Sequence, residues 1–336
     1  MKDTLTDCIK DKKTSYVPIW FMRQAGRYLP EFRAIRKENQ NFIKLCLNPT
    51  LVNEITLQPL KRFDIDAAII FSDILMIPYG LGQKVEFKKN VGPILGDLNF
   101  NIILNSKPED LIKKLTPVYE AIQRVKKNIK NKSLIGFVGA PWTILLYMLN
   151  KQSPKKNFNL NKIIKSKSLM RDLILKLEDT IFLHSKCQIE AGADIIQIFD
   201  SWAGLLPKDK LSEYCYIPTS KIVKNIKTLK TPTICFPKGL DKNYINFNKE
   251  VNPSCLSIDY DIDPKWAKEE LEGIPLQGGL DPKILLENND KIKKGVDKYI
   301  DTFKNYPYIF NLGHGVLPET KPETIEYLIT LIRSRK

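Results

Sequence analysis

Arginines are concentrated in one short stretch near the N-terminus. Residues 18–33 read PIWFMRQAGRYLPEFR and include Arg23, Arg27 and Arg33, with Arg36 shortly after. A guanidinium group stays charged at every relevant pH and binds a carboxylate through two parallel hydrogen bonds. Several arginines in a segment that also contains Gly and Pro therefore suit a ligand with several carboxylates. A phosphate clamp or a surface strip of salt bridges would use the same residues.

Asp73 stands directly after an apolar run. The sequence AAIIF at residues 67–71 precedes Ser72 and Asp73, so the carboxylate is expected at the mouth of a strand among apolar neighbours. A carboxylate in that position can act as a general base, bind a metal or accept hydrogen bonds from ligand N–H groups. An aspartate that only closes a turn or caps a helix would look the same.

The chain has two histidines, His184 and His314. His314 lies between two glycines in NLGHG, where the backbone needs freedom or a ligand comes close, although a histidine that fills a turn fits equally well. His184 falls in an amphipathic stretch and is interpreted as an ordinary packed or exposed side chain. No HxH, HExxH or GxSxG pattern occurs, so neither a protein-bound metal nor an esterase-type nucleophile is expected.

Eight short apolar runs recur along the chain, each followed by Gly, Pro or a polar residue. Their brevity and punctuation favour strands buried on both faces. The runs are residues 17–21, 67–71, 135–138, 194–199, 233–236, 255–257, 275–277 and 308–312.

Amphipathic segments fall between these runs, with apolar residues three or four apart. They are residues 108–129, 169–191, 212–229, 264–271 and 282–304. Alternating strands and helices predict an α/β fold with parallel pairing, and eight units favour a single (β/α)₈ TIM barrel over residues 1–336. An open doubly wound sheet is the alternative, but no GxGxxG or GxxxxGK[ST] motif occurs. Residues 78–106 form a long connection with room for a small hairpin.

The residues that follow the eight runs are rich in ionisable groups and glycine. In a (β/α)₈ barrel these positions share the rim that carries the active site. They are residues 23–27, 72–73, 139–141, Asp200 and Ser201, 237–239, Asp259, 278–279 and 313–315. We therefore expect an active-site cleft at the carboxyl ends of the strands.

The formal net charge of +15 and the pI near 9.3 allow two interpretations. One is an anionic partner, and the other is a generally lysine-rich, solvated surface. Six scattered cysteines without a CxxC pair favour reduced thiols. No apolar run is long enough to cross a bilayer, and the N-terminus lacks the apolar core of a secretory signal. A cytoplasmic protein without a membrane partner is expected.

Six motifs, in order along the chain, resemble the uroporphyrinogen decarboxylase family. They are FMRQAGRYLPEFR at residues 21–33, AAIIFSDIL at 67–75, FVGAPWTILLYM at 137–148, FDSWAG at 199–204, FPKG at 236–239 and NLGHG at 311–315. The resemblance extends from about residue 18 to the C-terminal helix. It implies a (β/α)₈ barrel, usually paired as a homodimer, that converts uroporphyrinogen III to coproporphyrinogen III and four CO₂ without a cofactor.

The resemblance also implies roles for individual residues. Those that match the family's cleft residues are Arg23, Arg27, Arg36, Asp73, Tyr147, Ser201 and His314. The arginines would bind substrate carboxylates, and Asp73 would accept hydrogen bonds from the four pyrrole N–H groups. Asp73, Arg23 and Tyr147 are the expected catalytic residues, with Arg23 as the family-based candidate for the proton donor. An ordinary arginine pKa above about 12 makes it a poor acid at neutral pH.

Three positions depart from the family pattern. Gly279 replaces a frequent asparagine, Tyr260 stands where tryptophan commonly follows Asp259, and the lysine-containing loop 151–156 replaces one that is often rich in Gly and Ser. They concern loops rather than the expected cleft residues.

Two other kinds of protein remain as alternatives. A methyltransferase of the same superfamily would need a His/Cys zinc cluster late in the barrel, and His314 has no cysteine beside it. A basic nucleic-acid-binding module would need a recognised motif or an exposed basic stripe with aromatics, and no such motif occurs. No nucleic-acid partner is therefore expected.

Overall fold

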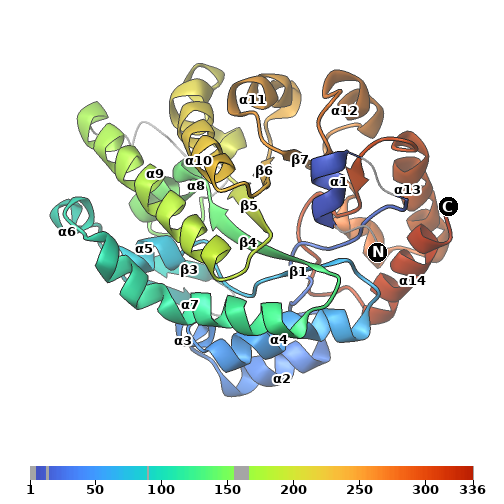
Figure 1. Cartoon of the computed structure of the whole chain (residues 1–336), viewed down its shortest axis with the longest axis horizontal. Coiled ribbons are helices and arrows are strands. Elements are labelled where there is room, and N and C mark those ends of the chain that lie inside the picture. Colours follow the sequence, from blue (N-terminus) through green and yellow to red (C-terminus); the bar gives the residue numbers. More distant parts are fainter. Residues whose placement is uncertain (1–4, 13–14, 89–90, 155–165, 336) are drawn as a thin grey trace.

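A parallel sheet of seven strands forms the centre of the fold. The computed structural model describes residues 5–12, 15–88, 91–154 and 166–335. The strands are ordered β1-β4-β5-β6-β7-β8-β9, and every neighbouring pair is parallel. They are β1 (Ala67–Ile69), β4 (Ser133–Gly139), β5 (Ile195–Asp200), β6 (Thr233–Pro237), β7 (Cys255–Ile258), β8 (Leu276–Gly278) and β9 (Tyr308–Ile309). Seven of the eight predicted strands are confirmed, and Figure 1 shows that the sheet is curled.

The predicted strand at residues 17–21 is wrong as a regular strand. Ile19 makes a single parallel bridge to Phe310, and its carbonyl accepts a hydrogen bond of 2.8 Å from Asp66 N at the start of β1. The segment thus lies between the two edge strands. Pro18 has no N–H to donate, and at Arg23 the backbone turns with a left-handed φ of 61°. Because of these two features, the segment does not form a longer ladder of strand hydrogen bonds.

Helices surround the curled sheet (Figure 1). Those that precede or follow the first strands are α1 (Leu5–Asp11), α2 (Pro30–Glu38), α3 (Phe42–Cys46), α4 (Pro49–Arg62), α5 (Met76–Gly80), α6 (Phe100–Leu104), α7 (Pro108–Asn128) and α8 (Pro141–Asn150). The later ones are α9 (Lys167–Glu190), α10 (Ile217–Thr228), α11 (Tyr244–Val251), α12 (Pro264–Glu270), α13 (Asn289–Thr302) and α14 (Pro322–Arg333). Five of them fall on the predicted amphipathic segments. Short turns, η2 (Ala203–Leu205), η3 (Lys208–Lys210), η4 (Ser212–Tyr216), η5 (Asp241–Asn243) and η6 (Pro282–Leu286), complete the described elements.

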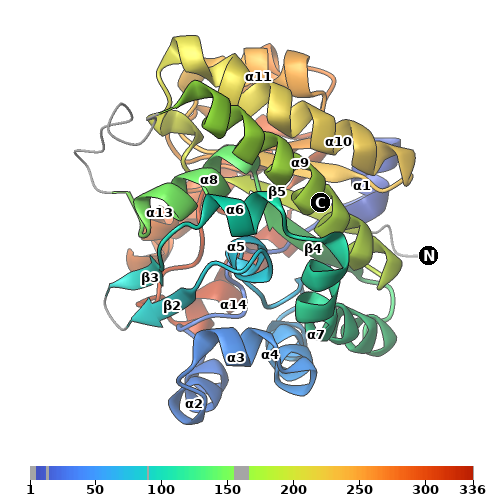
Figure 2. The same cartoon turned by 90° about the vertical axis from the view of Figure 1, so that its left-hand side faces the viewer.

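A two-stranded hairpin lies in the long connection after β1, as expected. Strands β2 (Val85–Lys88) and β3 (Gly92–Leu95) pair antiparallel. Ile94 bridges to Gln152, and Leu95 N donates to Lys151 O at 2.7 Å, so the hairpin is joined to the chain just after α8. Figure 2 shows it at the edge of the molecule, next to α8. Of the loop 151–156 that departs from the family pattern, positions 155 and 156 lie outside the described residues.

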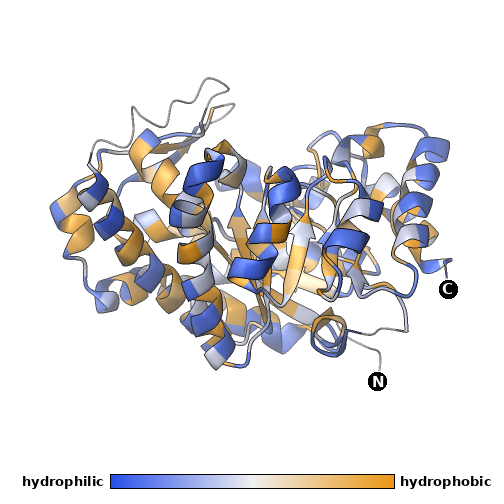
Figure 3. Ribbon diagram, turned by 90° about the horizontal axis from the view of Figure 1, so that it is seen from above, coloured by the Kyte–Doolittle hydropathy of each residue, from blue (hydrophilic) through white to orange (hydrophobic). Residues whose placement is uncertain are grey.

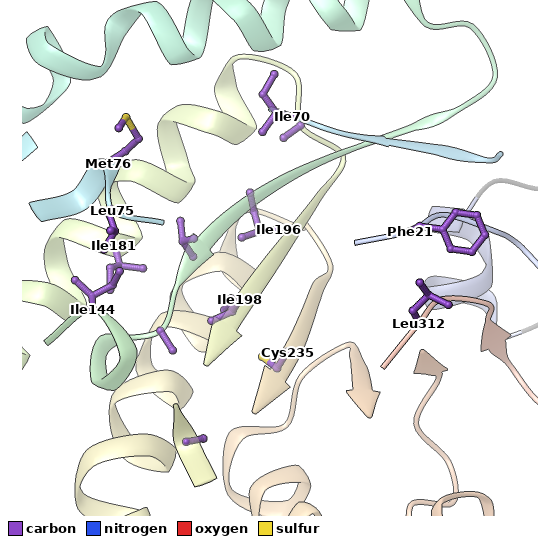
Figure 4. Close-up of a cluster of buried hydrophobic side chains, with 14 of the residues drawn as sticks. Phe21, Ile70, Leu75, Met76, Ile144, Ile181, Ile196, Ile198, Cys235 and Leu312 are labelled. Carbon is purple, nitrogen blue, oxygen red and sulfur yellow. The ribbon is translucent and has the colours of Figure 1, made fainter. Parts of the chain in front are cut away.

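Apolar side chains fill both the inside and the outside of the curled sheet. Inside, Leu5, Cys8 and Ile9 of α1 join strand residues such as Ile135 and Ile234, so α1 closes the amino-terminal end of the sheet. Outside, a larger cluster packs helices onto the strands; Figure 4 shows part of it, with side chains from β4, β5 and the surrounding helices. Polar residues lie mainly on the outer helix faces (Figure 3). Both faces of the sheet are thus buried, as parallel strands require.

Among the described helices, none combines the length and the apolar character that a transmembrane span would need.

Candidate active site

The segment that carries the arginines is held against the NLGHG loop, almost 300 residues away in sequence. Met22 N donates to Asn311 Oδ1 at 3.0 Å, and Met22 O accepts from Val316 N at 2.9 Å. Arg23 follows with its left-handed φ, and its side chain lies directly on Gly315. A Cβ on Gly315 would stand 2.4 Å from Arg23 Cδ, so only glycine leaves the space that this arginine occupies.

Gln24 is a buried residue that the sequence analysis did not single out. Its side chain is 1% exposed; Oε1 accepts from Phe21 N at 3.1 Å, and Nε2 donates to Ala67 O of β1 at 3.0 Å. Tyr28 OH donates to Gln24 O at 2.8 Å. Gln24 therefore fixes the arginine-bearing turn to the first strand. A glutamine between two arginines resembles a solvated surface residue in the sequence, and only its burial shows its role.

Arg23 shares its surroundings with charged groups from distant parts of the chain. The Arg23 side chain is partly exposed to solvent. Its partial burial and the neighbouring charge of Arg27 lower its pKa, whereas Asp73 and Tyr147 raise it. The structure therefore brings Arg23, Arg27, Asp73 and Tyr147 into one electrostatic neighbourhood. They come from the turn before β1, the loop after β1 and helix α8, whose positions are set by adjacent strands of the sheet.

Asp73 lies in the loop between β1 and α5. Its Oδ1 accepts a hydrogen bond from Leu75 N at 2.8 Å, as in an aspartate turn, while Oδ2 has no hydrogen-bond partner among the described residues. Burial raises the pKa of Asp73 to about 6, against the backbone hydrogen bond and the charge of Arg23, which lower it. At neutral pH the group is therefore a partly buried carboxylate with one oxygen free to accept a hydrogen bond. The turn interpretation is confirmed by the hydrogen bond to Oδ1, and a functional role for Asp73 stays a prediction.

His314 lies beside Arg23. Its Nδ1 accepts from Gly315 N at 2.7 Å, which leaves the proton of the neutral imidazole on Nε2. Burial, followed by the charges of Lys238 and Arg23, lowers the pKa of His314 to about 4. The ring is neutral at pH 7 and can donate one hydrogen bond from Nε2.

Tyr147 and Ser201 lie at the ends of α8 and β5. The Tyr147 ring meets Trp202 edge to face, with centroids 6.1 Å apart. Burial raises the pKa of Tyr147, so the phenol keeps its proton at neutral pH. Ser201 is partly exposed between Asp200 and Trp202. A buried pair underlies this loop: Thr143 Oγ1 donates to Asp200 Oδ1 at 2.5 Å and accepts from Trp202 N at 3.1 Å.

The two remaining arginines occupy different surroundings. Arg27 is exposed and close enough to Arg23 to lower its pKa. Arg36, near the end of α2, lies 5.4 Å from the centre of the Phe42 ring and donates to Asn39 O. Among the described residues, no interaction joins Arg36 directly to Arg23, Arg27 or Asp73. Arg33, which was not assigned a site role, donates to Arg27 O and Tyr28 O and braces the turn.

One departure from the family pattern has a structural reason. Gly279 has a φ of +104°, and a Cβ there would stand 2.5 Å from Tyr299 Cε1. Tyr299 OH donates to Gly279 O at 2.6 Å. A large buried tyrosine thus occupies the space that a side chain at position 279 would need. The glycine at position 279 is therefore explained by the packing of Tyr299 below the loop.

Within the described ranges, no three His, Cys, Asp or Glu side chains are grouped as metal ligands would be. All six cysteines are free thiols.

Comparison with known families decides where the chain belongs. The model of the family described as "Uroporphyrinogen decarboxylase (URO-D)" matches residues 1–335. The chain belongs to the uroporphyrinogen decarboxylase family. Two similar relatives, both named uroporphyrinogen decarboxylase, come from Rickettsia bellii and Rickettsia felis. The first is 44% identical over 321 residues, with 94% of each chain covered; the second is 42% identical over 330 residues, covering 96% of this chain and 94% of the relative.

Two solved structures with a similar fold are named as other enzymes. A methyltransferase from Methanosarcina mazei superposes with a TM-score of 0.81 at 17% identity, covering 99% of this chain and 98% of that one. A B12-independent methionine synthase from Shewanella sp. W3-18-1 gives a TM-score of 0.54 at 11% identity over 85% of each chain. At these identities the likeness concerns the fold alone.

Proposed function

We propose that this protein decarboxylates the four acetate side chains of uroporphyrinogen III, giving coproporphyrinogen III and CO₂ in porphyrin biosynthesis, without a cofactor. The observation that carries the proposal is the family match over residues 1–335, together with relatives of that name at 42–44% identity. The grouping of Arg23, Asp73, Tyr147 and His314 supports it, since these residues match the family motifs.

The substrate presents eight carboxylates around four pyrrole rings. Arg23, Arg27 and Arg36 are the residues that we assign to carboxylate binding, where a charge-assisted hydrogen bond contributes about 1.5–3 kcal/mol. The neutral His314 would donate from Nε2, and the Tyr147 and Ser201 hydroxyls supply further hydrogen bonds. A few such contacts are enough to fix the orientation of this ligand.

Asp73 is the residue that we assign to the pyrrole nitrogens, through the oxygen that its own backbone turn leaves free. Protonation of a ring carbon next to the acetate gives a cationic ring. The bond between the methylene carbon and the carboxylate carbon then breaks. Its electron pair forms an exocyclic double bond between the ring carbon and the methylene carbon, and CO₂ leaves. Protonation of the methylene carbon and loss of the ring-carbon proton give the methylpyrrole. A desolvated carboxylate beside the nitrogens stabilises both cationic intermediates because it is already in place.

Arg23 is our candidate for the group that delivers the proton. A lower pKa makes a group a stronger acid. The pKa of Arg23 is lowered by burial and by the charge of Arg27. Tyr147 is the remaining catalytic candidate, because its protonated hydroxyl shares the surroundings of Arg23 and Asp73.

We further propose one closed (β/α)₈ barrel over residues 1–336, with an active-site cleft at the carboxyl ends of the strands. The bridge from Ile19 to Phe310 and the hydrogen bond from Asp66 to Ile19 support closure. The proposal includes a homodimer, which the family resemblance implies. It also includes a cytoplasmic protein without nucleic-acid or membrane partners, as expected from the scattered cysteines, the short apolar runs and the missing binding motifs.

The deciding experiment is anaerobic incubation with uroporphyrinogen III, followed by oxidation and chromatography of the porphyrins. We expect products with seven, six, five and finally four carboxylates, and we expect turnover to continue after exhaustive chelation. A folded protein that leaves the eight-carboxylate substrate unchanged would contradict the proposal. Turnover lost on chelation and restored by zinc would instead favour the metal chemistry of a methyltransferase-like site.

A further inference from the structure

We propose that Lys238 forms, with Arg23 and His314, an additional subsite that binds one carboxylate of the substrate. The inference rests on the proposed function and deepens it, because it adds a residue that neither the family motif assignment nor the comparisons give a role. Four observations carry it: the rigid backbone at Lys238, the absence of an acidic ion-pair partner, its position relative to Arg23 and His314, and its partial burial.

The backbone at Lys238 is held firmly at the carboxyl end of β6. Lys238 N donates to Asp200 O at 3.1 Å, and Lys238 O accepts from Gly204 N at 3.0 Å. The next residue, Gly239, has a φ of +81°, and its N–H donates to Asp259 Oδ2 at 2.7 Å. The position of the Lys238 side chain is thus determined by both neighbouring strands, β5 and β7.

The acids nearest to Lys238 do not pair with it. Asp259 Oδ2 accepts from Gly239 N and Tyr244 OH, and Oδ1 accepts from Asp261 N. Among the described residues, no carboxylate lies within 4.0 Å of Lys238 Nζ, which instead lies 5.8 Å from the centre of the Tyr260 ring. Asp259 is occupied by backbone and tyrosine hydrogen bonds. The ammonium group therefore forms no ion pair within the described protein, although the charges of Asp259 and Asp261 act on it from farther away.

Lys238 faces the same groups that the proposed function assigns to the substrate. The Tyr260 ring that Lys238 approaches belongs to a segment packed against the loop of His314, since a Cβ on Gly313 would stand 2.4 Å from Tyr260 N. Burial lowers the pKa of Lys238, the charges of Asp259 and Asp261 raise it, and the charge of Arg23 lowers it. Two cations and a neutral N–H donor thus share one region, and the two aspartates offset only part of its positive charge. Like charges held close together and partly removed from water are unfavourable unless an anion lies between them. A substrate carboxylate meets that need.

The test compares Lys238→Met with Lys238→Arg and with the control Lys242→Met. Lys242 is an exposed lysine four residues away, so its loss changes the net charge equally. KM and kcat are measured for uroporphyrinogen III. The Kd is measured by fluorescence titration with uroporphyrin III, the stable oxidised form, and circular dichroism checks the fold.

We expect Lys238→Met to raise KM and Kd about 10- to 100-fold, as loss of one charge-assisted contact does, with kcat within about threefold of wild type. Lys238→Arg should stay within about threefold of wild type, and Lys242→Met should leave both constants unchanged. If Lys238→Met misfolds, Lys238→Gln gives a second neutral variant with the same expectation.

The outcomes separate the subsite from the function. Normal wild-type turnover with Lys238→Met or Lys238→Gln indistinguishable from Lys242→Met would overturn the subsite and leave the function standing. A wild-type protein without turnover would overturn both.

Discussion

At the scale of single residues, Asp73 has a structural role in a turn and a proposed chemical role. One carboxylate oxygen completes the turn that starts at the end of β1, and the other is left without a partner among the described residues. Burial raises its pKa to about 6, so the ionised form is held at a cost in stability. A residue selected for stability alone would not need that cost. A partly buried carboxylate with a free oxygen can stabilise a positive charge that develops on the ring.

We therefore expect Asp73→Asn to lower kcat by about 10²–10³-fold, the range seen when a preorganised electrostatic partner is removed. Asparagine keeps an oxygen for Leu75 N, so the turn should survive. Porphyrin chromatography measures kcat, and Asp172→Asn, an exposed aspartate on α9, is the matched control. Activity of Asp73→Asn within tenfold of wild type would show that the charge of Asp73 does not assist the reaction.

At the scale of elements, the junction between α8 and β5 positions two of the proposed site residues. Thr143, at the start of α8, binds Asp200 at the end of β5 and receives Trp202 N. Trp142 Nε1 donates to Trp202 O at 2.9 Å. Asp200 is 2% exposed, and burial raises its pKa to about 6 although Thr143 and Cys215 oppose the shift by hydrogen bonding. The pair holds the loop that carries Ser201 and places Trp202 against Tyr147.

Thr143→Val should reduce the free energy of unfolding by about 1–3 kcal/mol, because it removes one of the donors to the buried Asp200 carboxyl and the acceptor of Trp202 N–H. We also expect a lower kcat, since the loop that contacts Tyr147 loses its support. Thr143→Ser keeps the hydroxyl and is the control. Denaturant unfolding and porphyrin assays measure the two effects. Equal stability of the valine and serine variants would contradict this account.

At the scale of the whole molecule, the buried carboxyls and the buried imidazoles change the pH dependence of stability in opposite directions. Burial raises the pKa of Asp73 and Asp200 to about 6 from 3.8, and lowers the pKa of His184 and His314 to about 4 from 6.5. Between pH 4 and 6 the folded state holds protons on the two carboxyls that the unfolded state has released. The unfolded state holds protons on the two imidazoles. The contributions to the pH dependence of stability therefore largely cancel.

Replacing one of the two carboxyls should therefore change the pH dependence of stability. A carboxyl with a raised folded pKa favours folding below about pH 4, and this contribution is lost as the pH rises through about 6. Asp73→Asn should therefore be more stable than wild type by about 1–2 kcal/mol above pH 6.5, and the difference should vanish near pH 4. Thermal unfolding at pH 7.5, 6.0 and 4.5 measures it. A difference that is constant across this range would contradict the assignment of the raised pKa to Asp73.

The sequence by itself determined the local elements and the candidate residues. The brief apolar runs that became β4 to β7 and the amphipathic segments that became α7 and α9 follow from hydrophobic periodicity, which depends on neighbours in the chain. The connection before α7 was long enough to suggest its hairpin. Arg23, Asp73 and His314 were found because they follow predicted strand ends, whereas Tyr147 was named only through the resemblance to the family.

Only the tertiary structure decided what surrounds those residues. That Met22 binds Asn311, that Gly315 makes room for Arg23 and that Gln24 is buried against β1 depend on contacts between segments far apart in the chain. The same is true of the segment around Ile19, which its brief apolar run predicted as a strand and which forms one bridge. Burial and the nearness of other charges, which set each pKa and leave Lys238 without an ion pair, are properties of the folded molecule that no local pattern encodes.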